Sequence, residues 1–195
     1  MLVPIERLLQ RRSRYLELVA LRARLKTERA SAYGEDQAAA LHIRSLKLRL
    51  AATAGRVSSC GGCAAGKPWP RGAYAGGDCC SGVTEHLFAD TEVAALAQAG
   101  TRPRDLTAPR GDHPGCAFRG SAGCTLEVAH RPTVCVRYAC DGLLRELHQL
   151  GRLDEVEALS AELLQALQQF ETRLAERRDR ALVDEIAAAF ERSIT

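Results

Sequence analysis

The chain has 195 residues, a length that suits one domain, and its hydrophobic residues are mostly Ala and Leu with only 5% aromatic residues. That balance favours helices over a β-sandwich. The net charge of +3 is too small to indicate a nucleic-acid-binding protein, and no stretch approaches the roughly 18 apolar residues of a membrane-spanning helix. We therefore expect a mainly α protein that binds neither nucleic acid nor membrane.

The first segment, residues 1–56, predicts two helices joined by a short turn. Apolar residues recur at spacings of three and four from Ile5 onward, which predicts a helix over residues 5–32. Gly34 is a plausible stop and Asp36 a plausible N-cap for a second helix over residues 37–54. We expect these two helices to form an N-terminal helical hairpin.

The middle segment, residues 57–140, holds all the cysteines and differs sharply in composition. Its first part is rich in glycine and predicts a loop up to Gly82. A helix is predicted over residues 83–99, ended by Gly100, and a loop rich in proline and arginine follows up to Gly115. Residues 116–140 predict short strands or turns.

The last segment, residues 141–195, predicts helices again. Asp141 is a candidate N-cap for a helix up to Leu150, and Gly151 separates it from a long helix that begins near Leu153. In the long helix a heptad-like spacing of apolar residues runs to Leu174. We expect this run to pack on the N-terminal hairpin; pairing with a second copy is the alternative, and the sequence leaves the oligomeric state open.

Charge is distributed unevenly between the segments. Residues 1–56 carry a net charge of +7 and residues 141–195 a net charge of −5, while the middle segment is close to neutral at +1. Two explanations stand: the basic and acidic segments pair with each other in one compact unit, or the basic segment docks an acidic protein partner.

The eight cysteines are the candidate functional residues. A Cys-x-x-Cys turn presents two thiolates to one ion, and two more complete a tetrahedral site for zinc or the ligands of an iron–sulfur cluster. The first residues show no signal peptide, so we expect a cytoplasmic protein in which clustered thiols bind metal rather than form disulfides. The predicted metal ligands are Cys60, Cys63, Cys79, Cys80, Cys116, Cys124, Cys135 and Cys140.

How these cysteines divide is left open by the sequence. They permit two Cys₄ sites, one shared cluster, or one site with spare thiols. His113 and His130 lie close in sequence to Cys116 and Cys135, but we do not expect either histidine to be a ligand.

Arg131 is the predicted supporting residue next to the ligands. A zinc ion bound by four thiolates carries a charge of about −2, which nearby cations can balance. Pro132 fixes the turn after Arg131, and the guanidinium can donate to a thiolate or to a backbone carbonyl.

The cysteine pattern resembles a known family. The order Cys-x-x-Cys, Cys-Cys, Cys, Gly-Cys, Arg-Pro-x-x-Cys and Cys is similar to the zinc- or iron-chelating domains of the CxxCxxCC, or YkgJ-type, family. The resemblance covers roughly 80 of the 195 residues and involves all eight cysteines. One departure is the fifteen residues between Cys63 and Cys79, where the family has only a few. The resemblance implies chelation of zinc or iron; some relatives are linked to protein lysine methylation.

Three classes of function follow from this pattern. We expect first a non-catalytic metal-binding protein that carries an ion or docks a protein partner. The alternative is an iron–sulfur redox protein or an enzyme of the CxxCxxCC type, and whether the chain is an enzyme stays open. A disulfide-stapled module is the third class, which the expected cytoplasmic location disfavours. The sequence shows no nucleophile elbow and no glycine-rich phosphate loop.

Overall fold

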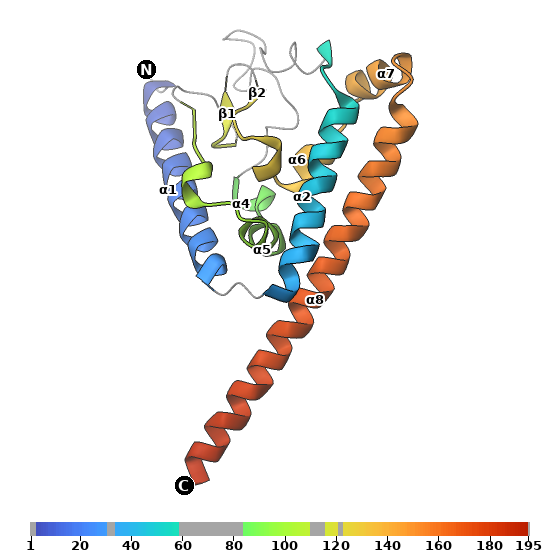
Figure 1. The fold of residues 1–195 in the computed structure, drawn as a ribbon. Helices are drawn as coiled ribbons and strands as arrows, with labels where there is room; N and C mark the ends of the chain where they lie inside the picture. Colours follow the sequence, from blue (N-terminus) through green and yellow to red (C-terminus); the bar gives the residue numbers. More distant parts are fainter. Residues whose placement is uncertain (1–2, 31–33, 59–83, 110–115, 121–122, 195) are drawn as a thin grey trace.

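The computed structural model describes residues 3–30, 34–58, 84–109, 116–120 and 123–194 (Figure 1). Within these residues the protein is mainly α-helical, as predicted. The elements are α1 (Val3–Ala30), α2 (Gly34–Ala54), α4 (Thr84–Leu87), α5 (Asp90–Gln98), the 3₁₀ helix η2 (Pro103–Asp105), β1 (Arg119–Gly120), β2 (Gly123–Cys124), the 3₁₀ helix η3 (Val128–His130), α6 (Thr133–Arg137), α7 (Asp141–Gln149) and α8 (Leu153–Ile194).

Helices α1 and α2 follow each other as predicted, but the hairpin they form is open. Helix α5 lies between them: α1 packs on α5, and α2 packs on α5 and on α8 (Figure 1). Seven consecutive residues of α5, from Glu92 to Gln98, are buried. Because α5 is rich in alanine, it lets helices approach closely on both of its sides. Helices α1 and α2 therefore share α5 as a packing partner.

The core consists of two clusters that meet at α5. Leu21 and Leu25 of α1 pack with Val93 and Leu96 of α5, and Phe118 from the cysteine region joins them. In this cluster the ring centroids of Phe88 and Phe118 lie 5.6 Å apart and the ring planes are tilted by 56°. This is a favourable geometry for two aromatic rings.

The second cluster joins α2, α5 and α8. Ile43 and Leu46 of α2 pack with Leu163 and Phe170 of α8, and Ala94 of α5 lies among them. Val93 and Leu96 belong to the first cluster whereas Ala94 and Ala95 belong to the second, so α5 contributes different faces to the two clusters. Cys116 and Phe118, from the described part of the cysteine region, thus pack in the helical core.

The predicted helix over residues 83–99 is divided in two. Helix α4 ends at Leu87, and Ala89 has an extended-like backbone (φ −57°, ψ 162°) before α5 begins at Asp90. The acidic residues Asp90 and Glu92 lie in the first turn of α5, where they suit the positive end of the helix dipole. Gly100 and Gly151 follow α5 and α7 with φ of 92° and 64°, the left-handed conformation that glycine adopts without strain.

Helix α8 is the longest element, with 42 residues. Its first half packs along α2, while its last turns extend beyond the other helices (Figure 1). Arg177 pairs with Asp36 at the start of α2, and Arg178 pairs with Glu28 of α1 at 3.0 Å. These ion pairs mark the place where α8 leaves the body of the protein.

In the part of the chain that the structure describes, no helix has the length and apolar character to cross a membrane.

Candidate functional site

Four of the eight predicted ligands lie in described residues. Cys116 precedes β1, Cys124 ends β2, Cys135 lies in α6, and Cys140 immediately precedes α7. Of these four, Cys116 is buried and the other three are partly exposed. The other predicted ligands, Cys60, Cys63, Cys79 and Cys80, lie outside the described residues, as does His113.

Cys116 is buried in the first core cluster, next to Thr84. Thr84 donates its hydroxyl to the sulfur at 3.9 Å and accepts the backbone N–H of Ala117 at 3.0 Å. Burial raises the pKa of the Cys116 thiol, the nearby Cys124 and Glu17 raise it further, and the hydrogen bonds oppose this change. A metal ion bound by Cys116 would have to stabilise the thiolate enough to offset the cost of placing its charge in a buried site.

Cys124 is held in a very short antiparallel ladder. Its backbone pairs with that of Arg119, whose side chain is buried, and Gly120 pairs with Gly123. A Cβ atom added at Gly120 would lie only 3.0 Å from the methyl group of Thr125, so the turn leaves almost no room for a side chain. The ladder brings Cys124 close to Cys116, and both belong to the core cluster around Phe118.

Arg131 connects the segment of Cys124 with that of Cys135. Its Nε donates to the carbonyl of Leu126 at 2.9 Å, and its Nη2 reaches the carbonyl of Cys124 at 3.5 Å. Four residues later in the chain, Cys135 lies in α6, which Pro132 precedes. The guanidinium therefore contacts backbone carbonyls here, one of the two kinds of acceptor that the sequence suggested.

A buried lysine and a buried glutamate hold the other side of this turn. Lys47 of α2, only 1% exposed, donates to Oε2 of Glu92 at 3.2 Å and to the carbonyl of Arg131 at 2.9 Å. Oε1 of Glu92 accepts the backbone N–H of Thr133 at 2.7 Å. Burial lowers the pKa of Lys47, whereas Glu92 and Cys135 act to raise it, which places Cys135 in the electrostatic surroundings of this pair.

The Lys47–Glu92 pair is the feature that sequence reasoning missed. The signal was present, because Lys47 lies four residues after Ile43 and three before Leu50, both buried on the core side of α2. A lysine in that position is inside the apolar stripe and needs a buried partner. The sequence does not identify this partner, since Glu92 lies 45 residues away in another helix.

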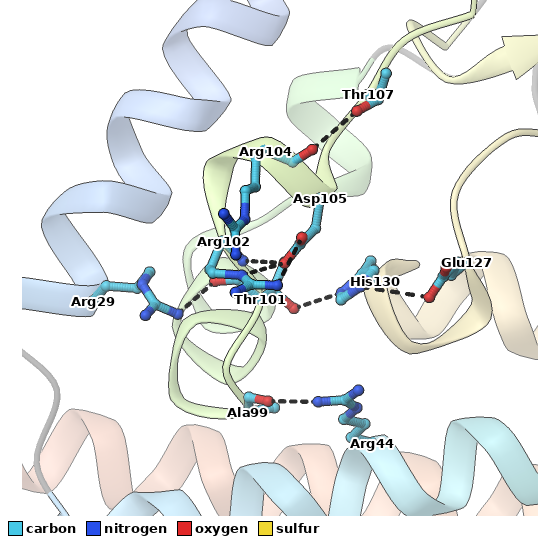
Figure 2. Close-up of polar contacts among 10 residues, drawn as sticks. All are labelled: Arg29, Arg44, Ala99, Thr101, Arg102, Arg104, Asp105, Thr107, Glu127 and His130. Carbon is cyan, nitrogen blue, oxygen red and sulfur yellow. Dashed lines mark hydrogen bonds and ion pairs between the residues drawn. The ribbon is translucent and has the colours of Figure 1, made fainter.

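His130 contacts the loop that follows α5 through a hydrogen bond with Thr101 (Figure 2). Its Nδ1 lies 2.9 Å from the hydroxyl of Thr101, and its Nε2 lies 3.9 Å from a carboxylate oxygen of Glu127. Arg29 of α1 donates to the carbonyl of Thr101 at 2.9 Å, and Arg44 of α2 donates to that of Ala99 at 3.0 Å. The loop between α5 and η2 is therefore fixed from three directions.

Cys140 is the N-cap residue of α7. Its carbonyl accepts the N–H of Leu144 at 2.9 Å, and the helix begins at Asp141. The N-cap was predicted at Asp141 and lies one residue earlier, at Cys140.

Among the described residues, no group of three or more histidine, cysteine or carboxylate side chains lies close enough to hold a metal ion. A Cys₄ site therefore needs thiols from the undescribed part of the cysteine region.

Comparisons with family models, with curated proteins and with solved structures found no match to this chain.

Proposed function

We propose that this protein binds zinc or iron through cysteine thiolates from both halves of residues 57–140, and that it carries the ion or docks a protein partner rather than catalysing a reaction. The resemblance to the CxxCxxCC family motivates the proposal. The donor set fits it, because thiolates are the ligands that zinc and iron–sulfur clusters prefer in proteins.

The observation that carries the proposal is the position of Arg131. This one residue contacts the carbonyl of Cys124 through its guanidinium, while its own carbonyl is anchored by Lys47. Two cysteine-bearing segments are thereby tied to one buried support. Such support from hydrogen bonds behind the ligands is characteristic of metal sites, where it orients the ligating groups. The positive charge of Arg131 would also help to offset the negative charge of a thiolate-rich centre in these segments.

Elemental analysis of anaerobically purified protein, with an absorption spectrum of the same sample, tests the proposal. Stoichiometric zinc without visible absorbance supports structural or carrier sites. Iron with acid-labile sulfide and visible absorbance supports the iron–sulfur alternative. Protein that is folded, holds neither metal and does not take up zinc or iron under reducing conditions would contradict both versions.

A pair of variants in α6 makes the test specific. Cys135→Ser should release metal, whereas Val134→Ser, at the adjacent and half-exposed position, should retain it. Helical content measured by circular dichroism distinguishes loss of a ligand from loss of the fold. Equal metal content in both variants would exclude Cys135 as a ligand.

A further inference from the structure

The described cysteines do not all lie beside the same core cluster. Cys116 belongs to the first cluster, formed with α1 and α5, and Cys124 packs against it. Cys135 lies in α6, and its neighbour Val136 packs instead against the second cluster, formed by α2, α5 and α8. Because α5 contributes different faces to these clusters, Cys135 belongs to a different part of the core from Cys116 and Cys124.

Cys116 and Cys124 are positioned by one short hairpin. The N–H of Arg119 donates to the carbonyl of Cys116 at 3.0 Å and closes a turn over residues 116–119. The backbone of the same arginine pairs with that of Cys124 in the β1–β2 ladder. Both cysteines therefore flank Arg119, and any movement of this hairpin moves them together.

Cys135 and Cys140 follow α8 rather than this hairpin. Helix α6 packs on α2 and α8, and α7, whose N-cap is Cys140, packs on α8. Between the two cysteines, Arg137 donates from Nε to the carbonyl and the hydroxyl of Ser160 in α8, at 2.9 and 3.0 Å. Four residues separate the two cysteines, and a Cys-x₄-Cys spacing occurs among the ligands of iron–sulfur clusters.

Arg131 lies between the hairpin and α6. Its Nη2 reaches the carbonyl of Cys124, while its own carbonyl accepts from Lys47. In the described part of the chain the guanidinium donates to carbonyls and is not paired with a carboxylate. Two centres of four thiolates, each with a charge of about −2, would repel each other, and a cation placed between them lowers this repulsion.

Resting on the metal binding proposed above, we propose that the chain holds two separate metal centres, one that includes Cys116 and Cys124 and one that includes Cys135 and Cys140. A single centre that took all of these thiols would bring three or more of them together, and among the described residues no such group exists. A tetrahedral site takes four ligands, and the eight cysteines of the chain are the number that two such sites need.

Titration of the reduced, metal-free chain with Co²⁺ counts the centres through the visible and near-ultraviolet bands of thiolate-bound cobalt. We expect the absorbance to saturate at two equivalents per chain. Saturation at one equivalent overturns the two centres while leaving metal binding itself intact. A folded chain that takes up neither cobalt, zinc nor iron contradicts the proposed function, and the two centres with it.

Two single variants assign the cysteines to the centres. Cys124→Ser and Cys135→Ser replace partly exposed thiols, and in competition with a chelator each should lose one of the two ions and keep the other. The double variant should lose both, and the two losses of absorbance should add up to the native spectrum because the centres share no ligand. Val134→Ser, at an exposed position beside Cys135, is the control and should keep both ions.

Loss of both ions in either single variant, with unchanged helical content by circular dichroism, overturns the proposal, since it shows one shared centre. The same holds for two single variants that lose the same cobalt bands. The count on the native chain needs no substitution, so it decides between one centre and two even where a variant fails to fold.

Discussion

The ammonium group of Lys47 donates to the backbone carbonyl of Arg131 at 2.9 Å while it pairs with Glu92 at 3.2 Å. Three elements distant in sequence thereby meet in one buried polar cluster: α2, α5 and the turn before α6. A charge pair withdrawn from water is costly unless its hydrogen-bonding groups are satisfied. Here the remaining carboxylate oxygen accepts the N–H of Thr133, so the pair fixes a backbone turn as well as balancing charge.

Replacing Lys47 with methionine should destabilise the protein by about 3–5 kcal/mol, because the carboxylate of Glu92 would be left buried without its cation. The double variant Lys47→Met with Glu92→Gln should recover part of this loss, since glutamine is neutral and still accepts the N–H of Thr133. Urea unfolding of the three proteins measures both effects. A loss below about 1 kcal/mol in Lys47→Met would show that the pair does not form as described.

The ion pair between Arg177 and Asp36 supports the point where α8 leaves the body. Because Asp36 is only 5% exposed, Arg177→Met should cost about 2 kcal/mol by leaving a buried carboxylate without its cation. Hydrogen exchange should then speed up in the turns of α8 around this position. Arg180→Met, three residues further along the exposed part of α8, is the control. Equal exchange in the two variants would show that the ion pair does not hold α8.

The sequence predicted where most helices lie but not how they assemble. Spacings of three and four identify helical stripes from the sequence, so α1, α2, α7 and α8 appear close to their predicted bounds. A stripe does not specify which helix covers it, and the insertion of α5 between α1 and α2 therefore could not be read from periodicity. The five-residue helix α6 was also missed, because one and a half turns are too short to display a helical period.

The sequence nominates the candidate ligands but not the contacts that surround them. Clustering alone singled out the cysteines, and the Arg-Pro pair singled out Arg131. The Thr84 hydroxyl between Cys116 and Ala117 had no sequence signal, because the contact joins residues more than thirty positions apart. Buried polar contacts of this kind follow from packing, which local patterns do not encode.

The lowered pKa of His130 predicts how the stability of the fold changes with pH. Burial lowers its pKa below the ordinary value of 6.5, and Arg44 and Arg102 act in the same direction. Asp105 and Glu127 face the ring as well and oppose this change. Because the unfolded chain takes up a proton on this histidine near pH 6.5 while the folded chain does not, the free energy of unfolding should fall as the pH decreases from 6.5 toward the lower folded pKa.

A histidine-to-glutamine variant isolates this contribution. His130→Gln preserves a hydrogen-bonding partner for Thr101 but does not titrate, so the other histidines contribute equally to both proteins. The difference in unfolding free energy between native protein and variant should therefore be flat above pH 7 and decline between about pH 6.5 and 5. A difference that is constant over this whole range would mean that His130 titrates alike in the folded and unfolded chains.

Arg131→Lys tests whether the turn before α6 supports a metal site. Lysine keeps the positive charge, but its single ammonium group does not reproduce the fork that reaches both Leu126 and Cys124. If the proposed ligands include Cys124 and Cys135, metal affinity should fall about 10- to 100-fold, the usual effect of removing support behind a ligand. Competition with a chelator of known affinity measures this change.

The matched control is Arg137→Lys, at the end of α6, because Arg137 donates to the backbone carbonyl and hydroxyl of Ser160 rather than to a cysteine-bearing segment. It should lower thermal stability slightly and leave metal affinity within about twofold. Unfolding of each metal-free variant separates a loss of fold from a loss of affinity. An Arg131→Lys protein that keeps native affinity would restrict Arg131 to a role in folding, since the guanidinium fork would then stabilise the turn without orienting any ligand.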